Sequence, residues 1–254
     1  MAETDPARGV QTALRALAIL EAFSVARPTL TVTEVSEDVG LSVPTTHRLL
    51  KALRSRELIV FDPATHRYSL GHGIMRMARV IMERDDLIGL AHSGLERLRT
   101  ETSETASLQR LLGEQRTAVD ELTSQHPIRM TSGVGNSYSL VRGASGKVML
   151  AFMPKRERDR LVQTSTEPAE LARELAVIAE RGYAESQGEV VAGAAAVAAP
   201  IFDACGAVVA AINVTGPAER FTAGRRAAAV PVLLEVTDNV TRQLGGAVAA
   251  RRVG

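Results

Sequence analysis

Residues 31–53, TVTEVSEDVGLSVPTTHRLLKAL, predict two short helices joined by a tight turn. Thr31 is a good N-cap for the first helix, and Glu34, three residues later, completes a capping box. Gly40 stands where the end of a helix favours a left-handed residue. Ser42 is then placed to cap the second helix. This helix-turn-helix arrangement restricts the fold of the chain more than any other feature of the sequence.

The second helix is predicted to have one buried and one exposed face. Apolar or small residues recur on the buried face at i, i+3, i+4 and i+7: Thr46, Leu49, Leu50 and Leu53. Small, polar or basic residues form the other face: Pro44, Thr45, His47, Arg48 and Lys51. A helix that buries leucines and presents short polar groups followed by cations suits the major groove of DNA. The alternative is an ordinary helical hairpin whose polar face is only solvated.

The segment after the second helix favours the DNA-binding interpretation. Residues 58–61 form a short β-rich run, residues 62–65 a turn, and residues 67–70 a returning strand. A hairpin in this position, tipped by His66 and Arg67, is a wing that can lie along a phosphate backbone. The predicted DNA-contacting residues come from the second helix and this wing: Ser42, Pro44, Thr45, Thr46, His47, Arg48, Lys51, His66 and Arg67.

Charge supports this prediction only locally. The net charge of +1 carries no general signature of nucleic-acid binding. Residues 45–67, however, contain a clear excess of lysine, arginine and histidine over the two acids Glu57 and Asp62. Such a local excess is expected where a protein contacts phosphates. Aromatic residues make up only 3% of the chain, with no tryptophan, which argues against single-strand binding by base stacking.

The remaining composition excludes several classes of protein. A single cysteine, Cys205, rules out a disulfide within one chain. The five histidines show no metal-ligand spacing with cysteine or carboxylates, so no metal or other cofactor is expected. The N-terminus lacks a charged-then-apolar signal, and no apolar run has transmembrane length. We therefore expect a cytoplasmic protein without a membrane partner.

Helices are predicted on both sides of the helix-turn-helix. Residues 1–9 are polar and predicted to be disordered, and residues 11–25 predict a helix that packs beneath the helix-turn-helix. A helix starting at Ile74 carries more apolar surface than a linker needs. It either packs on its own domain or forms a dimer interface, and we favour the dimer interface. Residues 85–86 are predicted to cap the next helix, which ends near Thr102.

The C-terminal part predicts an α+β domain of the ligand-sensing kind. Strands are predicted at 106–112, 116–122, 128–131, 194–202 and 208–215. Helices are predicted around 148–152, 156–162, 168–181 and 222–244, the last kinked or split at Pro231. The 254 residues thus divide into a winged helix-turn-helix domain, a linker helix, an effector domain and a disordered tail: 1–71, 72–85, 86–245 and 246–254.

The run Ser145-Gly146-Lys147 matches neither of two catalytic motifs. A P-loop would need glycine at Val141 and serine or threonine at Val148. A nucleophile elbow would need glycine in place of Lys147, which is more simply interpreted as a solvated side chain. Ser145 is instead predicted to cap a helix whose N-terminus faces an anionic or polar ligand group. No nucleophile pairs with a base in this sequence, so we do not expect an enzyme.

Taken together, five segments resemble the IclR family of bacterial transcription regulators. They are ALRALAILEAF at 13–23, VGLSVPTTHRLLKAL at 39–53, RYSLG at 67–71, YSLVRGASGKVMLAF at 138–152 and AAPIFDACGAVVAAINVTGP at 198–217. The resemblance implies a GAF-like effector domain, a homodimer or dimer of dimers, and an affinity for operator DNA that changes with a small metabolite. The alternative is a metabolite-binding module or hydrolase-like enzyme with a vestigial helix-turn-helix domain.

The resemblance also implies which residues contact the effector: Met130, Ala144, Ser145, Gly146, Ser186, Ala196, Asn213 and Thr215. Asn213 and Thr215 alternate along a strand and point to the same side, although both would also be ordinary in a solvent-facing strand. Ala196 stands where a family segment ends in cysteine, and Ser186 stands where an acidic contact is expected. We therefore expect a pocket more apolar than those for small acids, and an effector less polar than a short keto acid.

Overall fold

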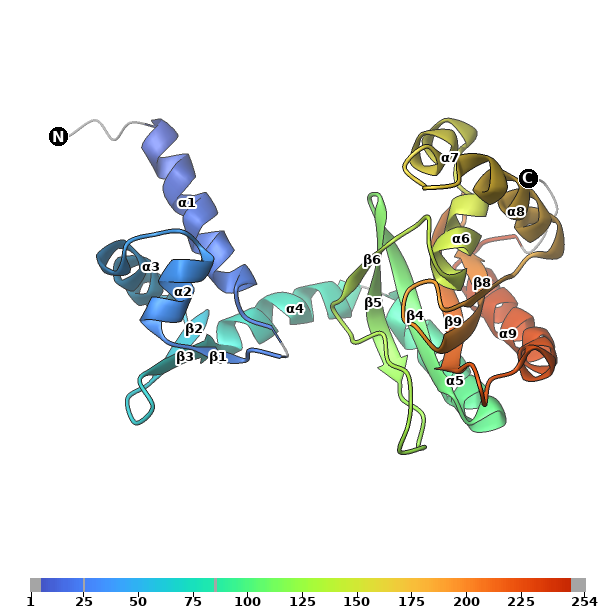
Figure 1. Ribbon diagram of the computed structural model, residues 1–254, viewed down its shortest axis with the longest axis horizontal. Helices are drawn as coiled ribbons and strands as arrows, with labels where there is room; N and C mark the ends of the chain where they lie inside the picture. The colour runs from blue at the N-terminus through green and yellow to red at the C-terminus, as the bar shows by residue number, and fades with distance from the viewer. Residues whose placement is uncertain (1–5, 25, 85, 248–254) are drawn as a thin grey trace. The chain divides into compact units, whose positions relative to one another are not determined.

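The computed structural model describes residues 6–24, 26–84 and 86–247 (Figure 1). The chain separates into two compact units, residues 1–84 and 85–254. Each unit contains its own cluster or clusters of buried apolar side chains. Residues 1–5, Val25 and Asp85, and the predicted tail from residue 248 onward, lie outside the described residues.

The first unit is a winged helix-turn-helix. Its helices are α1 (Pro6–Glu21), α2 (Val32–Asp38), α3 (Val43–Ser55) and α4 (His72–Arg84). Its antiparallel sheet has the strand order β1-β3-β2, formed by β1 (Thr29–Leu30), β2 (Ile59–Asp62) and β3 (Arg67–Leu70). Helices α1, α2 and α3 and the sheet contribute to one core, which includes Ile19, Leu30, Val35, Leu50 and Ile59. The predicted helix, turn, helix and wing are all confirmed.

The two helices of the motif begin and end largely as predicted. Thr31 Oγ1 accepts a hydrogen bond from the Glu34 N–H at 3.3 Å, and Glu34 Oε2 accepts one from the Thr31 N–H at 2.6 Å. These bonds from Thr31, together with Arg67, hold the pKa of Glu34 below its usual value. Gly40 has a φ of 64°, the left-handed conformation expected there. Ser42 is the N-cap of α3, but its hydroxyl donates to a neighbouring side chain and makes no cap bond.

Replacing Thr31 with alanine is expected to destabilise the first unit by about 1 kcal/mol, because the Glu34 N–H loses its acceptor, Thr31 Oγ1. Thr33→Ala is the matched control, since Thr33 is exposed on the same helix and outside the capping box. Urea unfolding of both variants followed by circular dichroism measures the difference. Equal losses for the two variants would show that the capping box contributes nothing.

Helix α1 differs from its prediction in extent and in orientation. It begins at Pro6, so the disorder predicted for residues 6–9 is wrong, and it ends at Glu21. Leu14 and Leu17 were expected to pack beneath the motif, yet they are 55% and 54% exposed. Ile19 is buried in their place. With about 3.6 residues per turn, the side of α1 that carries Leu14 and Leu17 lies opposite the side that enters the core.

The second unit is built on a six-stranded antiparallel sheet of order β6-β5-β4-β9-β8-β7. Its strands are β4 (Thr105–Leu112), β5 (Gln115–Leu122), β6 (Ser137–Ser139), β7 (Ala184–Gln187), β8 (Ala194–Phe202) and β9 (Val208–Pro217). Its helices are α5 (Asp86–Thr102), α6 (Ala144–Ala151), α7 (Lys155–Val162), α8 (Pro168–Arg181) and α9 (Ala223–Gln243). This arrangement confirms the predicted α+β class.

The sheet separates two cores, because successive residues of a strand point to opposite faces. On one face α5 and α9 cover residues such as Val197 and Ile212. On the other face α6, α7 and α8 cover Ala198, Phe202 and Ala211. The helices of the two faces are distinct in Figure 1, with α6 above the sheet in that view. The N-terminus of α6 therefore lies against one end of the sheet, where the cavity described below is found.

The second unit differs from the sequence prediction at three places. Residues 128–131 form no strand, and the third strand of the hairpin region is β6, which pairs Ser139 with Gln115 of β5. The short polar strand β7 was not predicted, since AESQ shows no apolar alternation. Helix α9 continues through Pro231 without being split. Pro231 has no N–H to donate to the preceding turn of the helix. Leu233 and Val236, which follow it in α9, are buried, and their burial offsets that missing hydrogen bond.

Candidate DNA interface and effector pocket

Helix α3 presents the predicted exposed face. Pro44, His47, Arg48 and Lys51 are exposed and Thr45 is half-buried. The leucines opposite them are buried in the core of the first unit. Thr46, which we also expected to contact DNA, has no exposed surface, and its hydroxyl donates to the Ser42 carbonyl at 3.2 Å. That prediction is corrected, because a side chain turned into the core cannot reach a base edge.

The two cations of this face are not neutralised. Among the residues that the structure describes, no carboxylate lies within ion-pairing distance of Arg48 or Lys51. Nearby acids are engaged elsewhere: Asp38 pairs with Arg27 at 3.0 Å and Glu57 with Arg76 at 2.7 Å. Two unpaired positive charges on an exposed helix face are suited to phosphate contacts.

The wing carries only part of the predicted contact set. His66 is exposed in the turn and has a φ of 53°. Arg67 points elsewhere: its Nη2 lies 3.0 Å from Glu34 Oε2, and its Nε donates to Thr29 Oγ1 at 3.1 Å. The structure therefore assigns Arg67 to holding the wing against β1 and α2 rather than to the tip. The alternation of residues along the strand does not indicate that Arg67 pairs with Glu34, which lies 33 residues away in the sequence.

The second unit contains a cavity of about 260 Å³ at the N-terminus of α6. All predicted effector residues except one line it: Met130, Ala144, Ser145, Ser186, Ala196, Asn213 and Thr215. Gly146 is the exception. A Cβ on Gly146 would lie 2.7 Å from the Leu140 carbonyl oxygen and 2.9 Å from that of Ser139. Glycine is thus required there for close packing of α6, and its predicted effector contact stays a prediction.

The first turn of α6 is held by one side chain from β7 and one from the segment after it. Ser186 Oγ accepts a hydrogen bond from the Ala144 N–H at 3.0 Å, and Glu189 Oε2 accepts one from the Gly143 N–H at 2.9 Å. Gly143 is the N-cap, with a φ of 77° that favours glycine. The N–H of Ser145, at the second position of the helix, has no partner within the helix itself. A helix N-terminus of this kind favours a negatively charged ligand group.

The floor of the cavity is polar. Asn213 is only 5% exposed, and its Oδ1 accepts a hydrogen bond from Ser107 at 2.5 Å. Its Nδ2 donates to Thr215 Oγ1 at 2.7 Å. The solvent-facing alternative for Asn213 is therefore wrong. Both side chains line the cavity from β9, as the alternation along that strand predicted.

Sequence reasoning missed the charged residues of the pocket. Arg116 of β5 is 5% exposed, and its guanidinium lies 4.9 Å from the ring of Tyr138. Burial lowers the pKa of Arg116 to about 10, so the side chain remains charged at neutral pH. Lys147, expected to be solvated, is buried and lies 2.6 Å from carboxylate oxygens of both Glu174 and Glu189. No local pattern around either cation indicates these partners, which are far away in the sequence.

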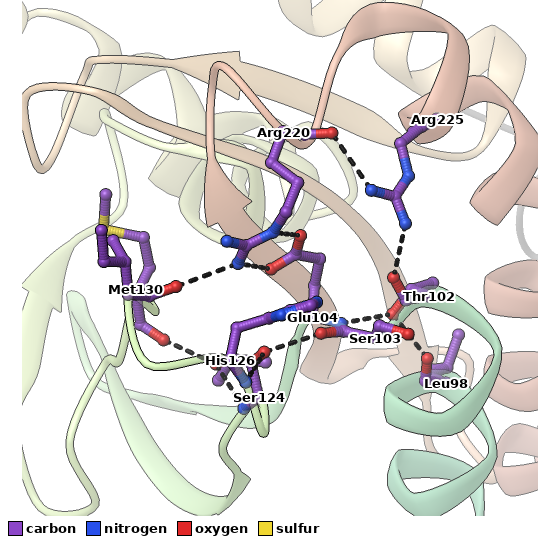
Figure 2. A network of polar contacts seen from close by, with 11 residues as sticks. Leu98, Thr102, Ser103, Glu104, Ser124, His126, Met130, Arg220 and Arg225 are labelled. Carbon is purple, nitrogen blue, oxygen red and sulfur yellow. Dashed lines mark hydrogen bonds and ion pairs between the residues drawn. The ribbon is translucent and has the colours of Figure 1, made fainter.

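A second polar network fixes the loop that carries Met130 (Figure 2). Glu104 is fully buried, and Arg220 donates to its two carboxylate oxygens at 2.6 and 2.8 Å. The same guanidinium donates to the Ile128 carbonyl at 3.1 Å. Thr105 Oγ1 donates to the Met130 carbonyl at 2.6 Å. These bonds attach the loop to the sheet and to the start of α9, and they replace the strand pairing predicted for residues 128–131.

The described residues contain neither a candidate metal centre nor a helix that could span a membrane. Within residues 6–247, excluding Val25 and Asp85, no three His, Cys, Asp or Glu side chains are grouped so that they could hold a metal ion. In the same part of the chain, none of the helices combines the length and the apolar composition needed to span a bilayer. Cys205 is exposed in the turn between β8 and β9.

Both units match known families. Residues 12–63 match the IclR helix-turn-helix domain, and residues 80–242 match the family described as bacterial transcriptional regulator IclR C-terminal. The HTH-type transcriptional regulator BhcR of Paracoccus denitrificans (strain Pd 1222) is 30% identical, over 96% of this chain and 89% of the relative. The helix-turn-helix match coincides with the unit that presents the cationic helix, and the other match includes every residue lining the cavity.

Solved structures give the same result. The crystal structure of Pseudomonas aeruginosa HmgR is 30% identical, with a TM-score of 0.77 over 92% of this chain and 99% of that one. An IclR homologue from Microbacterium hydrocarbonoxydans, crystallised with 4-hydroxybenzoate, has a TM-score of 0.82 over 92% and 98% of the two chains. At 21% identity that second likeness shows the fold alone. With both of its units matched, this chain belongs to the IclR family of bacterial transcriptional regulators.

Proposed function

We propose that α3 and the wing bind duplex DNA at a specific sequence, and that a small molecule in the α6 cavity changes the affinity for that DNA. The observation that carries the proposal is the exposed face of α3, which has unpaired cations on one side and buried leucines on the other. Arg48 and Lys51 contact phosphates, whereas Ser42, Pro44, Thr45 and His47 approach base edges. His66 contacts the backbone from the wing.

The enzyme alternative is not favoured. The relatives are named as transcriptional regulators, and the cavity offers no activated nucleophile. Ser145, in the first turn of α6, would need a base to act as a nucleophile. The nearby Lys147 is held by the carboxylates of Glu174 and Glu189 and is therefore not positioned to act as that base.

We further propose that the protein acts as a homodimer or a dimer of dimers. Apolar side chains are exposed on two helices of the first unit: Val10, Leu14 and Leu17 on α1, and Met75, Met77 and Val80 on α4. An exposed apolar stripe of this kind favours burial against another copy of the chain. Two copies place two recognition helices on successive turns of the duplex, about 34 Å apart.

The effector is proposed to have an apolar body and to be less polar than a short keto acid. Ala196, Val190 and Met130 line the cavity with apolar surface. The volume of about 260 Å³ suits a molecule with a single ring or a branched chain. A structural neighbour in complex with 4-hydroxybenzoate makes this compound a reasonable first probe.

The DNA-binding proposal is tested on a duplex selected by the full-length protein from a random library. Arg48→Ala with Lys51→Ala is expected to weaken binding and to lower the slope of log affinity against log salt by about 1.8, since each lost phosphate contact lowers it by roughly 0.9. Fluorescence anisotropy at several salt concentrations gives both quantities. Lys155→Ala with Arg156→Ala removes the same charge from α7, where both side chains are exposed, and is the matched control. Failure to enrich any sequence, or an unchanged slope, would reject the proposal.

A further inference from the structure

Arg116 lines the pocket but has no role in the function proposed above. It enters the cavity wall from the start of β5 and is almost fully buried. Its Nη1 donates to Gln109 Oε1 at 3.2 Å, and its Nη2 makes a long contact of 3.4 Å with the Arg142 carbonyl. Its Nε is buried without any hydrogen-bond partner. A buried guanidinium normally has every donor satisfied and a carboxylate beside it.

The other charges of the region do not neutralise Arg116. Lys147 pairs with both Glu174 and Glu189, and Glu104 pairs with Arg220. Among the described residues, no carboxylate oxygen lies within 4.0 Å of the Arg116 guanidinium, the distance that defines an ion pair. The buried cation that lines the cavity thus lacks a direct counter-ion in the protein. A charge of this kind is expected where a ligand supplies the missing partner.

The hydrogen bonds across the floor also require an acceptor in the ligand. They run in one direction from Arg116 to Gln109, Ser107, Asn213 and Thr215, at 3.2, 3.1, 2.5 and 2.7 Å. Each side chain in this row accepts from the one before it. The Thr215 oxygen therefore accepts from Asn213 and keeps its own hydrogen for another acceptor. With the Ser145 N–H of α6, the cavity presents several donors and two cationic side chains, Arg129 and the buried Arg116.

We propose that Arg116 binds a carboxylate group of the effector, which is accordingly a monocarboxylate with an apolar or aromatic body. The carboxylate lies between the guanidinium and the first turn of α6. Planar guanidinium and carboxylate groups form charge-assisted hydrogen bonds, and Nη2, whose contact with the Arg142 carbonyl is long, is the donor offered to the ligand. Glu189 at the same helix end disfavours a dianion such as phosphate. The body of the ligand contacts Met130, Tyr138 and Val190.

This inference rests on the proposed role of the cavity as the effector site, and its test needs no DNA. The full-length protein is mixed at about 10 mM with matched acid and amide pairs: benzoate and benzamide, 4-hydroxybenzoate and 4-hydroxybenzamide, isovalerate and isovaleramide. At least one acid is expected to raise the Tm by about 2 °C or more, and its amide by much less. Calorimetry then gives the Kd of the acid that binds best.

Arg116→Gln is expected to weaken binding of that acid by at least about 30-fold while leaving the amide nearly unchanged, so that the preference for the acid disappears. Arg116→Lys keeps the positive charge but lacks the planar set of guanidinium donors. It is expected to bind the acid more tightly than Arg116→Gln and less tightly than the unchanged protein. Arg160→Gln, on the exposed surface of α7, removes one charge outside the cavity and is the control. Circular dichroism of each variant verifies folding.

The proposal is overturned if no acid raises the Tm, if an amide binds as tightly as its acid, or if Arg116→Gln retains the preference. The two proposals fail separately. If the protein selects a duplex but binds none of the acids, only the carboxylate site is rejected. If it binds an acid but selects no duplex, the DNA-binding function is rejected and the carboxylate site stands.

Discussion

Arg220→Met is expected to lower the free energy of unfolding of the second unit by about 3–5 kcal/mol, the usual cost of leaving one buried charge without its partner. Glu104 has no exposed surface, and both of its carboxylate oxygens accept hydrogen bonds from Arg220. The space around Glu104 is also closed, because a Cβ on Gly216 would lie 2.6 Å from its carboxylate. Denaturant unfolding of the second unit, followed by circular dichroism, measures the loss.

Two further variants isolate the cause. Arg160→Met breaks an ion pair with Glu114 that is exposed on both sides, and is expected to cost less than about 1 kcal/mol. Adding Glu104→Gln to Arg220→Met removes the stranded charge and is expected to recover part of the stability. A loss for Arg220→Met no larger than that for Arg160→Met would mean that the buried pair does not stabilise the fold. Because Arg220 also holds the Ile128 carbonyl, the variant should loosen the loop that carries Met130.

Leu50→Ala is expected to destabilise the first unit by about 2–5 kcal/mol, through lost burial and the cavity left behind. Leu50 is fully buried in α3 and belongs to the core that also holds Val35, Ile59 and Tyr68. This core is small, so the loss is a large fraction of its total stability. The variant is expected to lose DNA binding at 37 °C although no DNA-facing residue has changed.

Val43→Ala is the matched control, because Val43 lies on the same helix and is 43% exposed. It is expected to change stability by no more than about 0.5 kcal/mol. Thermal unfolding and duplex binding are measured on both variants at 15 °C and 37 °C. If Leu50→Ala binds the selected duplex as well as Val43→Ala at 37 °C, then α3 does not depend on this core for its position.

Local signals in the sequence predicted most elements of the fold. Helix α8 runs from Pro168 to Arg181 as predicted, because proline marks its first turn and Gly182 its left-handed end. The buried stripe of α3 follows directly from the helical period. Strand β6 and strand β7 were missed, since each is short and polar and is defined by its neighbours. Pairing of that kind leaves little trace in a single segment.

The predicted site includes positions whose place depends on the local backbone. It lacks the buried cations, whose place depends on partners far away in the sequence. The cavity-lining positions on β9 and α6 were implied by the family resemblance, and the alternation along β9 agrees with them. The prediction that Lys147 is solvated was wrong because the carboxylates that pair with it, those of Glu174 and Glu189, lie 27 and 42 residues away in the sequence. Arg116 gave no signal either, since its burial depends on Tyr138 and on the neighbouring strand. Thr46 was correctly placed on the buried face with the leucines, and its inclusion among the DNA contacts was inconsistent with that placement.

The cores of the two units share no buried side chain. A change of residue in the cavity therefore leaves the packing beneath α3 intact, and a change in α3 leaves the cavity intact. Descendants of such a chain can acquire a new inducer while keeping their target promoter, or move to a new promoter while still responding to the old inducer. Independent drift of the two specificities is the evolutionary freedom that this architecture provides.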